Sequence, residues 1–369
     1  MNKKLNQLMQ DIRIILAIAW KDILDGWKNK IIVSSILTSL FLVVFYNYMP
    51  ELTRGNDPPV LGFFFENETF TVGDLEYSPN FRIFTTTNIT TFMDALRDIE
   101  TPGIGIMLNE NIEELQANPS AIELEGYVPY WMKSSQISTL KASVERELAS
   151  YWDHPVEIRT SGNLVYPTMD SMAFGKGFIA AAGLILGFVI MGLSMAPQLI
   201  IEEKENQTLQ AVMVSPASLS HFILGKAVAV LFYTTIITII GLFFVGPLVL
   251  HWGIILIAII IGMMTIIIPG LLVGVLLKNK QQASIWIWVL FIPTMLPLFL
   301  SIVRVLPDVL QKIIDWWPMV ALFRLVRAGL TYQPSLSSFY REVIYLVGFS
   351  LIFLGLTIYA IKKQTLKGT

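Results

Sequence analysis

Long apolar stretches of the chain are separated by polar stretches. Long runs without charge occupy about residues 31–49, 177–200, 227–250, 253–277, 283–303 and 343–361. About twenty apolar residues in a helix are enough to cross the hydrocarbon core of a bilayer. The pattern therefore predicts an α-helical polytopic membrane protein with six transmembrane helices, one before and five after a long polar stretch.

That polar stretch, residues 50–171, has a different pattern, in which charged residues, Pro, Asn and Thr return. Short β-like runs lie at Leu61–Phe65, Arg82–Thr86, Ile104–Leu108, Ile122–Val128 and Val156–Arg159. Helical spacing covers Ile89–Ile99 and Ser134–Tyr151. These elements predict a mixed α/β extracytoplasmic domain between the first and second spans.

Residues 1–30 are amphipathic. Apolar residues recur at three- and four-residue spacing, at Leu5, Leu8, Ile12, Ile15, Leu16, Ala19, Trp20, Ile23 and Trp27. Because a span follows directly, we interpret this segment as a cytoplasmic interfacial amphipathic helix. A helix packed on a soluble partner is the alternative.

Composition agrees with a membrane protein. The chain has 369 residues, of which 54% are hydrophobic and only 15% are charged, and its mean hydropathy is +0.61. Soluble proteins carry about 25% charged residues. The absence of cysteine excludes disulfides, thiol catalysis and thiolate metal sites. The net charge is −2 and no basic domain stands out, so no nucleic acid partner is expected.

Basic residues set the predicted orientation. Six spans put both termini on one side, with Lys3, Lys4, Arg13, Lys21, Lys28, Lys30, Lys204, Lys226, Lys278, Lys280, Lys362, Lys363 and Lys367. By the positive-inside rule this side is cytoplasmic, in a cell (plasma or inner) membrane. The connector 304–342, with Arg304, Lys312, Arg324, Arg327 and Arg341, argues the other way, and its placement stays open.

No catalytic machinery is recognisable. The chain has no G-x-x-x-x-G-K-[ST] phosphate loop, and its three histidines are far apart in sequence. The predicted spans lack Asp and Glu in their central portions, which disfavours an intramembrane protease or an ion-coupled carrier. We therefore expect no catalytic residue and no metal site. Movement driven from outside the membrane domain fits this pattern better.

Glycine pairs mark two of the spans. Gly183 and Gly187 lie four residues apart in the second span, and Gly270 and Gly274 in the fourth. Small residues at this spacing let helix backbones approach closely. They predict helix packing within one bundle, with a dimer interface as the alternative.

The segment 202–214 follows the second span. Four charged residues come first, Glu202, Glu203, Lys204 and Glu205, and an apolar face at Leu209, Val212 and Met213 follows until Ser215-Pro216 ends the pattern. This predicts a short amphipathic helix on the cytoplasmic side that docks into a soluble partner. A solvated loop is the alternative.

Residues 203–218, E-K-E-N-Q-T-L-Q-A-V-M-V-S-P-A-S, resemble the coupling segment of ABC-2 type transporter permeases, which commonly reads E-x-E-x-G-T-L-E-x-L-x-x-x-P-x-S. Glu203, Glu205, Thr208, Leu209, Pro216 and Ser218 match, and Gln207 stands where glycine is usual. The resemblance covers almost the whole chain. It includes the interfacial helix with Trp20-Lys21-Asp22 and an outer re-entrant segment at 316–330.

The resemblance implies the permease subunit of an ATP-driven ABC exporter. A separate ABC ATPase subunit would bind ATP and Mg, and this chain would bind no cofactor. Two permease copies would assemble as a homodimer or heterodimer. The residues implied in ATPase coupling are Glu202, Glu203, Lys204, Glu205, Thr208, Leu209, Val212 and Pro216. The substrate stays open among amphiphiles, lipids, polymers and ions.

Two other classes of function are compatible with spans and an outer domain. A membrane receptor or sensor would read a ligand through residues 50–171, but it would need a cytoplasmic signalling domain. A secondary carrier would be expected to show inverted repeats. One span before the outer domain and five after it are not two halves.

Overall fold

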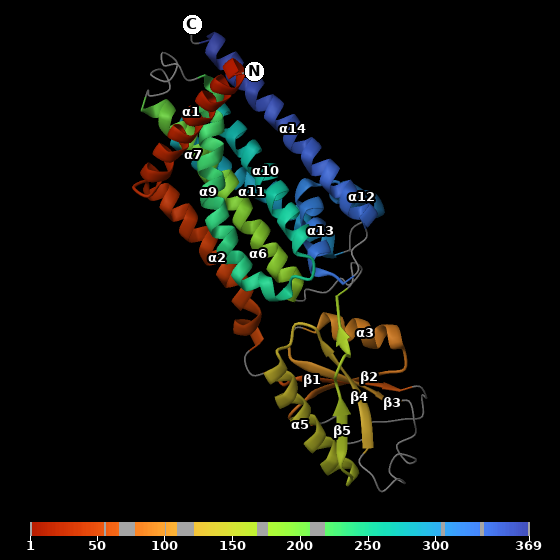
Figure 1. Cartoon of the computed structure of the whole chain (residues 1–369). Coiled ribbons are helices and arrows are strands. Elements are labelled where there is room, and N and C mark those ends of the chain that lie inside the picture. Colours follow the sequence, from red (N-terminus) through yellow and green to blue (C-terminus); the bar gives the residue numbers. More distant parts are fainter. Residues whose placement is uncertain are drawn as a thin grey trace. The chain divides into compact units, whose positions relative to one another are not determined.

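The computed structural model describes residues 2–54, 57–65, 78–99, 101–108, 122–167, 176–206, 218–303, 307–332 and 336–367. By its internal contacts the chain divides into two compact units. The helical unit consists of Met1–Asn47, Ile179–Gly329 and Pro334–Thr369, and the sheet unit of Tyr48–Phe178 with Leu330–Gln333 (Figure 1).

Long apolar helices build the helical unit. The helices are α1 (Asn2–Gly26), α2 (Lys30–Arg54), α6 (Lys176–Ile190), the π-helical turn η2 (Met191–Met195), α7 (Ala196–Glu205), α9 (Leu219–Val245), the 3₁₀ turn η3 (Gly246–Leu248), α10 (Trp252–Leu276), α11 (Lys280–Val303), α12 (Asp308–Asp315), α13 (Pro318–Leu330) and α14 (Leu336–Lys367). Five described stretches are long and apolar enough to cross a membrane. The predicted first span falls in α2, whose described apolar stretch, Ile32–Phe45, is shorter. The unit is consistent with a polytopic membrane protein.

Helix α10 packs against α14, α7 and η2. A Cβ atom on Gly270 would lie 1.9 Å from the carbonyl oxygen of Gly192, and one on Gly274 would lie 2.8 Å from the Cα atom of Pro197. The backbones of α10 and η2–α7 therefore touch directly, as small residues allow.

The other predicted glycine pair lies on α6. Gly183 and Gly187 are both buried. A Cβ atom on Gly187 would lie 3.1 Å from Cγ2 of Val43 on α2 and 3.5 Å from Cγ2 of Ile237 on α9. Gly187 therefore lies where α2, α6 and α9 meet within one chain.

The π-helical turn has a local cause. Pro197 lacks a backbone N–H and cannot complete an α-helical hydrogen bond, and the N–H of Ala196 bonds to the carbonyl of Met191 instead. Gly192 lies within this turn and packs against Ile266 of α10.

Two helices extend beyond the apolar runs from which they were predicted, because polar residues form their end turns. α9 begins at Leu219 rather than 227, because Ser218 caps it: its Oγ accepts a hydrogen bond from the N–H of His221 at 3.3 Å. α7 continues to Glu205 rather than ending near 200. Residues 202–205 are thus the last turn of α7 and not the start of a separate helix. The rest of the predicted helix 202–214, from 207 on, lies outside the described residues.

The connector 304–342 contains α12 and α13. α13 covers most of the segment 316–330 and is largely buried, with Val320, Ala321 and Leu322 at the core. Arg324 lies 3.6 Å from the carboxylate of Glu342 on α14. One arginine of the connector therefore has a carboxylate partner within the protein.

The sheet unit contains β1 (Val60–Phe65), β2 (Arg82–Thr86), β3 (Gly103–Leu108), β4 (Ile122–Pro129), β5 (Val156–Arg159) and β6 (Leu164–Val165), with helices α3 (Ile89–Asp98) and α5 (Ser134–Trp152). The strand order is β2-β1-β3-β4-β5, and β6 pairs with β4. Among the strand pairs of the described residues, β3–β4 is antiparallel and the others are parallel. All five predicted strands and both predicted helices are confirmed, and β6 was not predicted.

Two apolar cores lie in the sheet unit. Leu140, Val144 and Leu148 of α5 pack into one core with residues of β1, β3, β4 and β5. Phe92 and Leu96 of α3 pack into the other. The unit therefore has the two-sided burial of an independent α/β fold.

Candidate functional site

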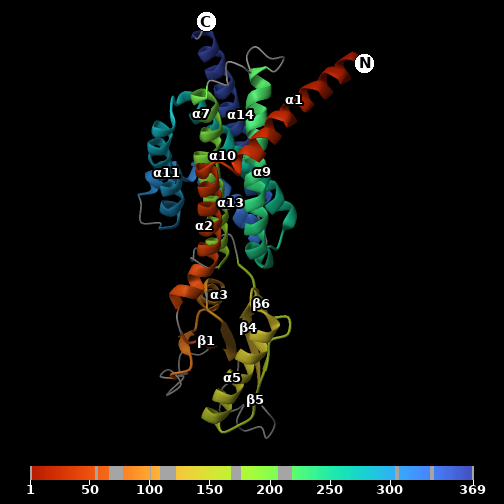
Figure 2. The same cartoon turned by 90° about the vertical axis from the view of Figure 1, so that its left-hand side faces the viewer.

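Helix α1 has one packed side and one exposed apolar side. Along one side it packs against α9 so closely that a Cβ atom on Gly225 would lie 2.6 Å from Cγ2 of Ile18. The Tyr233 hydroxyl on α9 donates a 2.5 Å hydrogen bond to the Ile23 carbonyl. The other side exposes large apolar side chains, Leu5, Leu8, Met9, Ile12, Leu16, Trp20 and Leu24, and Trp27 in the turn after the helix is exposed as well. Figure 2 shows α1 meeting α2 at an angle.

Charged residues are buried where α1, α7 and α9 meet. Lys226 of α9 is 1% exposed, and its Nζ donates to Asp22 Oδ1 at 2.7 Å and to Glu203 Oε1 at 2.9 Å. Lys21 Nζ donates to the same Glu203 oxygen at 3.0 Å. Two ammonium groups and two carboxylates thus form one network, which we call the ion-pair network (Lys21, Asp22, Glu203 and Lys226).

The neighbours of Glu203 on α7 contact other elements. Glu202 Oε2 accepts a 2.7 Å hydrogen bond from the Asn29 amide, at the junction of α1 and α2. Glu205 Oε1 accepts a 2.8 Å hydrogen bond from the backbone N–H of Lys280, which begins α11, and Lys280 Nζ lies 3.6 Å from Glu205 Oε2.

Lys204, the remaining charged residue of this run on α7, binds the C-terminal end of α10. Its Nζ donates to the carbonyls of Gly274 at 3.0 Å, Leu277 at 2.9 Å and Val275. A cation is favoured there because the carbonyls of a helix C-terminus carry partial negative charge. The four consecutive charged residues of α7 therefore bond to four different parts of the bundle.

Burial shapes the electrostatics of the ion-pair network. Desolvation raises the pKa of Asp22 above 3.8, although Lys226 opposes the shift. Asp22 Oδ2 is buried and has no hydrogen-bond partner among the described residues. Burial tends to lower the pKa of Lys21, but the hydrogen bond to Glu203 and its charge outweigh burial, so that this pKa is raised. A buried ion pair contributes little net stability when whole, but breaking it by removing one partner is costly.

The structure brings together some of the predicted coupling residues and not others. Glu202, Glu203, Lys204 and Glu205 are engaged within the bundle. Thr208, Leu209, Val212 and Pro216 lie outside the described residues. Sequence reasoning did not single out Asp22 and Lys226 as site residues. Their signal is a charge on the packed face of an amphipathic helix and a lysine early in an otherwise apolar one.

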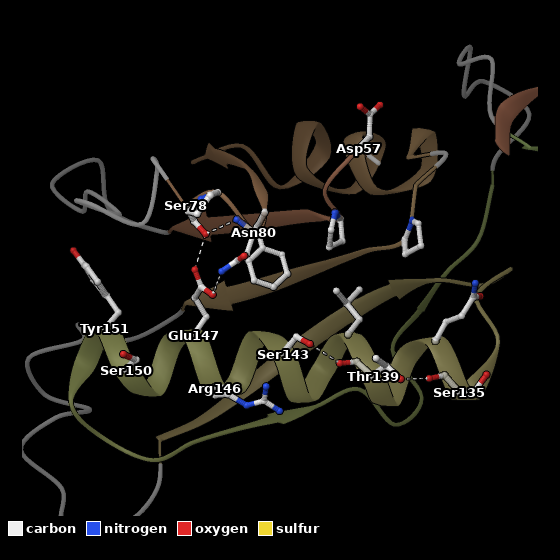
Figure 3. A pocket seen from close by; sticks show the side chains of 16 residues that line it. Asp57, Ser78, Asn80, Ser135, Thr139, Ser143, Arg146, Glu147, Ser150 and Tyr151 are labelled. Carbon is white, nitrogen blue, oxygen red and sulfur yellow. Dashed lines mark hydrogen bonds between the residues drawn. The ribbon is translucent and has the colours of Figure 1, made fainter. Parts of the chain in front are cut away.

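The sheet unit contains a groove of about 1270 Å³ between α5 and the segments that precede β1, β2 and β3. Figure 3 shows Glu147 bridging it, with its carboxylate accepting from Ser78 Oγ at 2.5 Å and Asn80 Nδ2 at 2.9 Å. The hydroxyls of Thr139 and Ser143 donate to carbonyls of their own helix. The described residues contain no group of three or more potential metal ligands.

The comparisons with known proteins agree with the arrangement of the chain. The family of ABC-2 family transporter proteins matches residues 30–359. No curated protein and no solved structure matches the chain. The matched range runs from the start of α2 nearly to the end of α14 and includes both units. The chain therefore belongs to the ABC-2 family of transporter proteins and is an ABC-2 type permease.

Proposed function

We propose that this chain is the membrane subunit of an ATP-driven exporter, and that an ATPase subunit drives it through residues 207–217. One observation carries the proposal. Glu203 lies on α7, four residues before this segment, and Lys226 lies on α9, nine residues after it, and their side chains are joined at 2.9 Å. The helices that lead into and out of the segment, α7 and α9, are therefore joined by one buried network, so that displacement of the segment can reach both helices.

The contacts of α7 supply the route of transmission. Leu209 and Val212 would fill a groove of the ATPase, flanked by Thr208 and Pro216. Displacement of the segment would pull on the end of α7. From there Glu202 leads to the α1–α2 junction, Glu203 to α1 and α9, and Lys204 and Glu205 to α10 and α11. Coupling energy is carried by such contiguous hydrogen-bonded and packed contacts.

The remaining parts of the proposal concern orientation and assembly. The basic residues at the α7–α9 end of the bundle favour the cytoplasm on that side, with both termini there and the sheet unit outside. Two permease copies would form the pathway, and each would bind an ATPase subunit that holds ATP and Mg. The substrate would leave the cytoplasm or the inner leaflet.

The test is coupling in the assembled complex. The double variant Leu209→Asp, Val212→Asp places two charges on the proposed docking face, and we expect it to lose co-purification of the ATPase. The matched control is Val309→Asp on α12, which is 71% exposed and far from the segment in sequence. Co-purification that survives the double variant, or fails equally in the control, would refute docking through this segment.

A further inference from the structure

A cavity of about 280 Å³ adjoins the ion-pair network. Its lining comes from the end of α1, the turn before α2, the last turn of α7, and Lys226 of α9. It therefore opens where several helices of the bundle end together. Nothing in the proposed coupling route requires a hollow here.

The described lining carries more negative than positive charge. Four carboxylates, those of Asp22, Asp25, Glu202 and Glu203, face three ammonium groups. The ion-pair network is neutral in itself. Asp25 has a loose partner in Lys28, at 3.7 Å, whose side chain is 82% exposed. Glu202 is left with the Asn29 amide as its partner among the described residues.

Two carboxylates at this cavity thus lack full compensation. Glu202 has no cation among the described residues. Asp22 is 4% exposed; its Oδ1 accepts a hydrogen bond from Lys226, but its Oδ2 receives none from the described residues. A buried carboxylate oxygen without a donor is unfavourable, and the half-buried carboxylate of Glu202 can accept further hydrogen bonds beside the one from Asn29. The cavity therefore favours a cationic occupant with several N–H donors, as a primary ammonium has.

The surroundings indicate where that ammonium comes from. Trp20 of α1 and Trp27 in the turn after it are 60% and 59% exposed, and they directly neighbour the lining residues Lys21, Gly26 and Lys28 in the sequence. Tryptophan favours the headgroup region of a bilayer. The exposed Lys28 at the rim can meet an anionic group that follows the ammonium. Ammonium inside and phosphate at the rim is the charge order of an ethanolamine phospholipid headgroup.

We propose that this cavity binds the headgroup of a zwitterionic aminophospholipid. The carboxylates of Glu202 and Asp22 attract its ammonium, and Lys28 attracts its phosphate. The inference rests on the proposed function only in assigning the lipid to the cytoplasmic leaflet. Lipid binding is measured without the ATPase, so failure of either idea is distinguishable from failure of the other.

The experiment uses the full chain in nanodiscs of phosphatidylcholine with increasing phosphatidylethanolamine of the same acyl chains. Lipids retained after extraction into detergent are counted by native mass spectrometry. We expect ethanolamine lipid to be retained roughly tenfold over choline lipid, since choline has no N–H donor and one charge-assisted hydrogen bond is worth about this factor. Equal retention would overturn the proposal.

Variants locate the site. Glu202→Gln keeps the shape and removes the charge, and we expect it to abolish the preference. Lys28→Gln, on an exposed side chain, should weaken it severalfold without affecting the fold. Asp11→Asn removes a carboxylate of α1 that lies outside the cavity, 3.3 Å from His221, and should leave the preference intact. A preference that survives both cavity variants, or that falls equally in Asp11→Asn, would contradict the assignment.

A competition experiment distinguishes a lipid from a soluble ligand. Free phosphoethanolamine presents the same headgroup without acyl chains. We expect it to compete weakly, because the exposed apolar face of α1 contributes to lipid binding. If it raises the unfolding temperature as much as the lipid does at equal concentration, the lipid is not the specific occupant.

Discussion

Lys226 and Glu203 lie on opposite sides of residues 207–217 in the sequence, and their side chains meet at 2.9 Å in the interior. Lys226 also bonds to Asp22, 204 residues away. One lysine thus joins α1, α7 and α9. The ends of three helices are held together at the point where the proposed docking segment leaves the bundle.

Replacing Lys226 by methionine tests the cost of opening this junction. The variant leaves Asp22 and Glu203 buried without their shared partner, and we expect a loss of about 3–5 kcal/mol in stability. Thermal unfolding of the detergent-solubilised protein measures it. Lys28→Met, at an 82% exposed side chain, is the control and should be nearly neutral. A small effect at Lys226 would show that the network is not intact in solution.

The raised pKa of Asp22 predicts a pH dependence. An acid whose pKa is higher in the folded state contributes stability that is complete below its unfolded value, here 3.8, and that is lost as the pH rises through the folded value. The groups that face this carboxyl group are Lys226, Glu203, Lys21 and Tyr233. They are present in both the wild type and Asp22→Asn, so the difference in stability between the two proteins reports the ionisation of Asp22.

The measurement is unfolding of wild type and Asp22→Asn in parallel from pH 4 upward. We expect the wild type to lose stability relative to the variant over the range in which Asp22 ionises, and the difference then to level off. A wild type that gains relative stability over that range would contradict the raised pKa.

The contact between α10 and the π-helical turn predicts intolerance of a single methyl group. In Gly270→Ala the new Cβ atom would lie 1.9 Å from the carbonyl oxygen of Gly192, so backbone must move. We expect a loss of about 1–3 kcal/mol. Gly253→Ala on the same helix meets nothing within 4 Å and should be neutral or slightly stabilising. Equal unfolding temperatures for the two variants would argue against this packing.

The sheet unit should fold by itself. Its two cores lie within residues 48–178. We expect that fragment to give the circular dichroism of a mixed α/β protein with cooperative thermal unfolding. As a control, Val144→Asp places a charge at a fully buried position and should abolish the transition. An unstructured wild-type fragment would show that the fold depends on the helical unit.

Local patterns predicted local structure well. Period-two and helical spacing located β1 to β5, α3 and α5, because each has a buried face and turn residues beside it. Hydropathy located the long helices but misplaced the start of α9 and the end of α7, since a capping serine and charged side chains extend a helix beyond its apolar part. The π-helical turn was missed because its cause, Pro197, only shifts hydrogen bonds.

The sequence predicted the charged residues of the candidate site but not their partners. The charged run at 202–205 is visible in the sequence, but its partners are not, because Asp22, Asn29 and Lys226 approach it only through tertiary packing. We predicted an acidic lead-in presented to a partner. The structure engages these side chains within the bundle, and the proposed partner surface therefore lies in the residues that follow.

Cross-linking tests docking through that surface most directly. The chain has no cysteine, so single-cysteine variants react without background. In the complex with its ATPase, Val212→Cys labelled with maleimide-benzophenone should form a photo-cross-link to the ATPase subunit, because the activated ketone inserts into C–H bonds of the nearest chain and needs no second thiol. Leu310→Cys on α12, 48% exposed, should form none. A cross-link from position 212 alone is the predicted result. No cross-link there, or one of equal yield from position 310, would contradict the account.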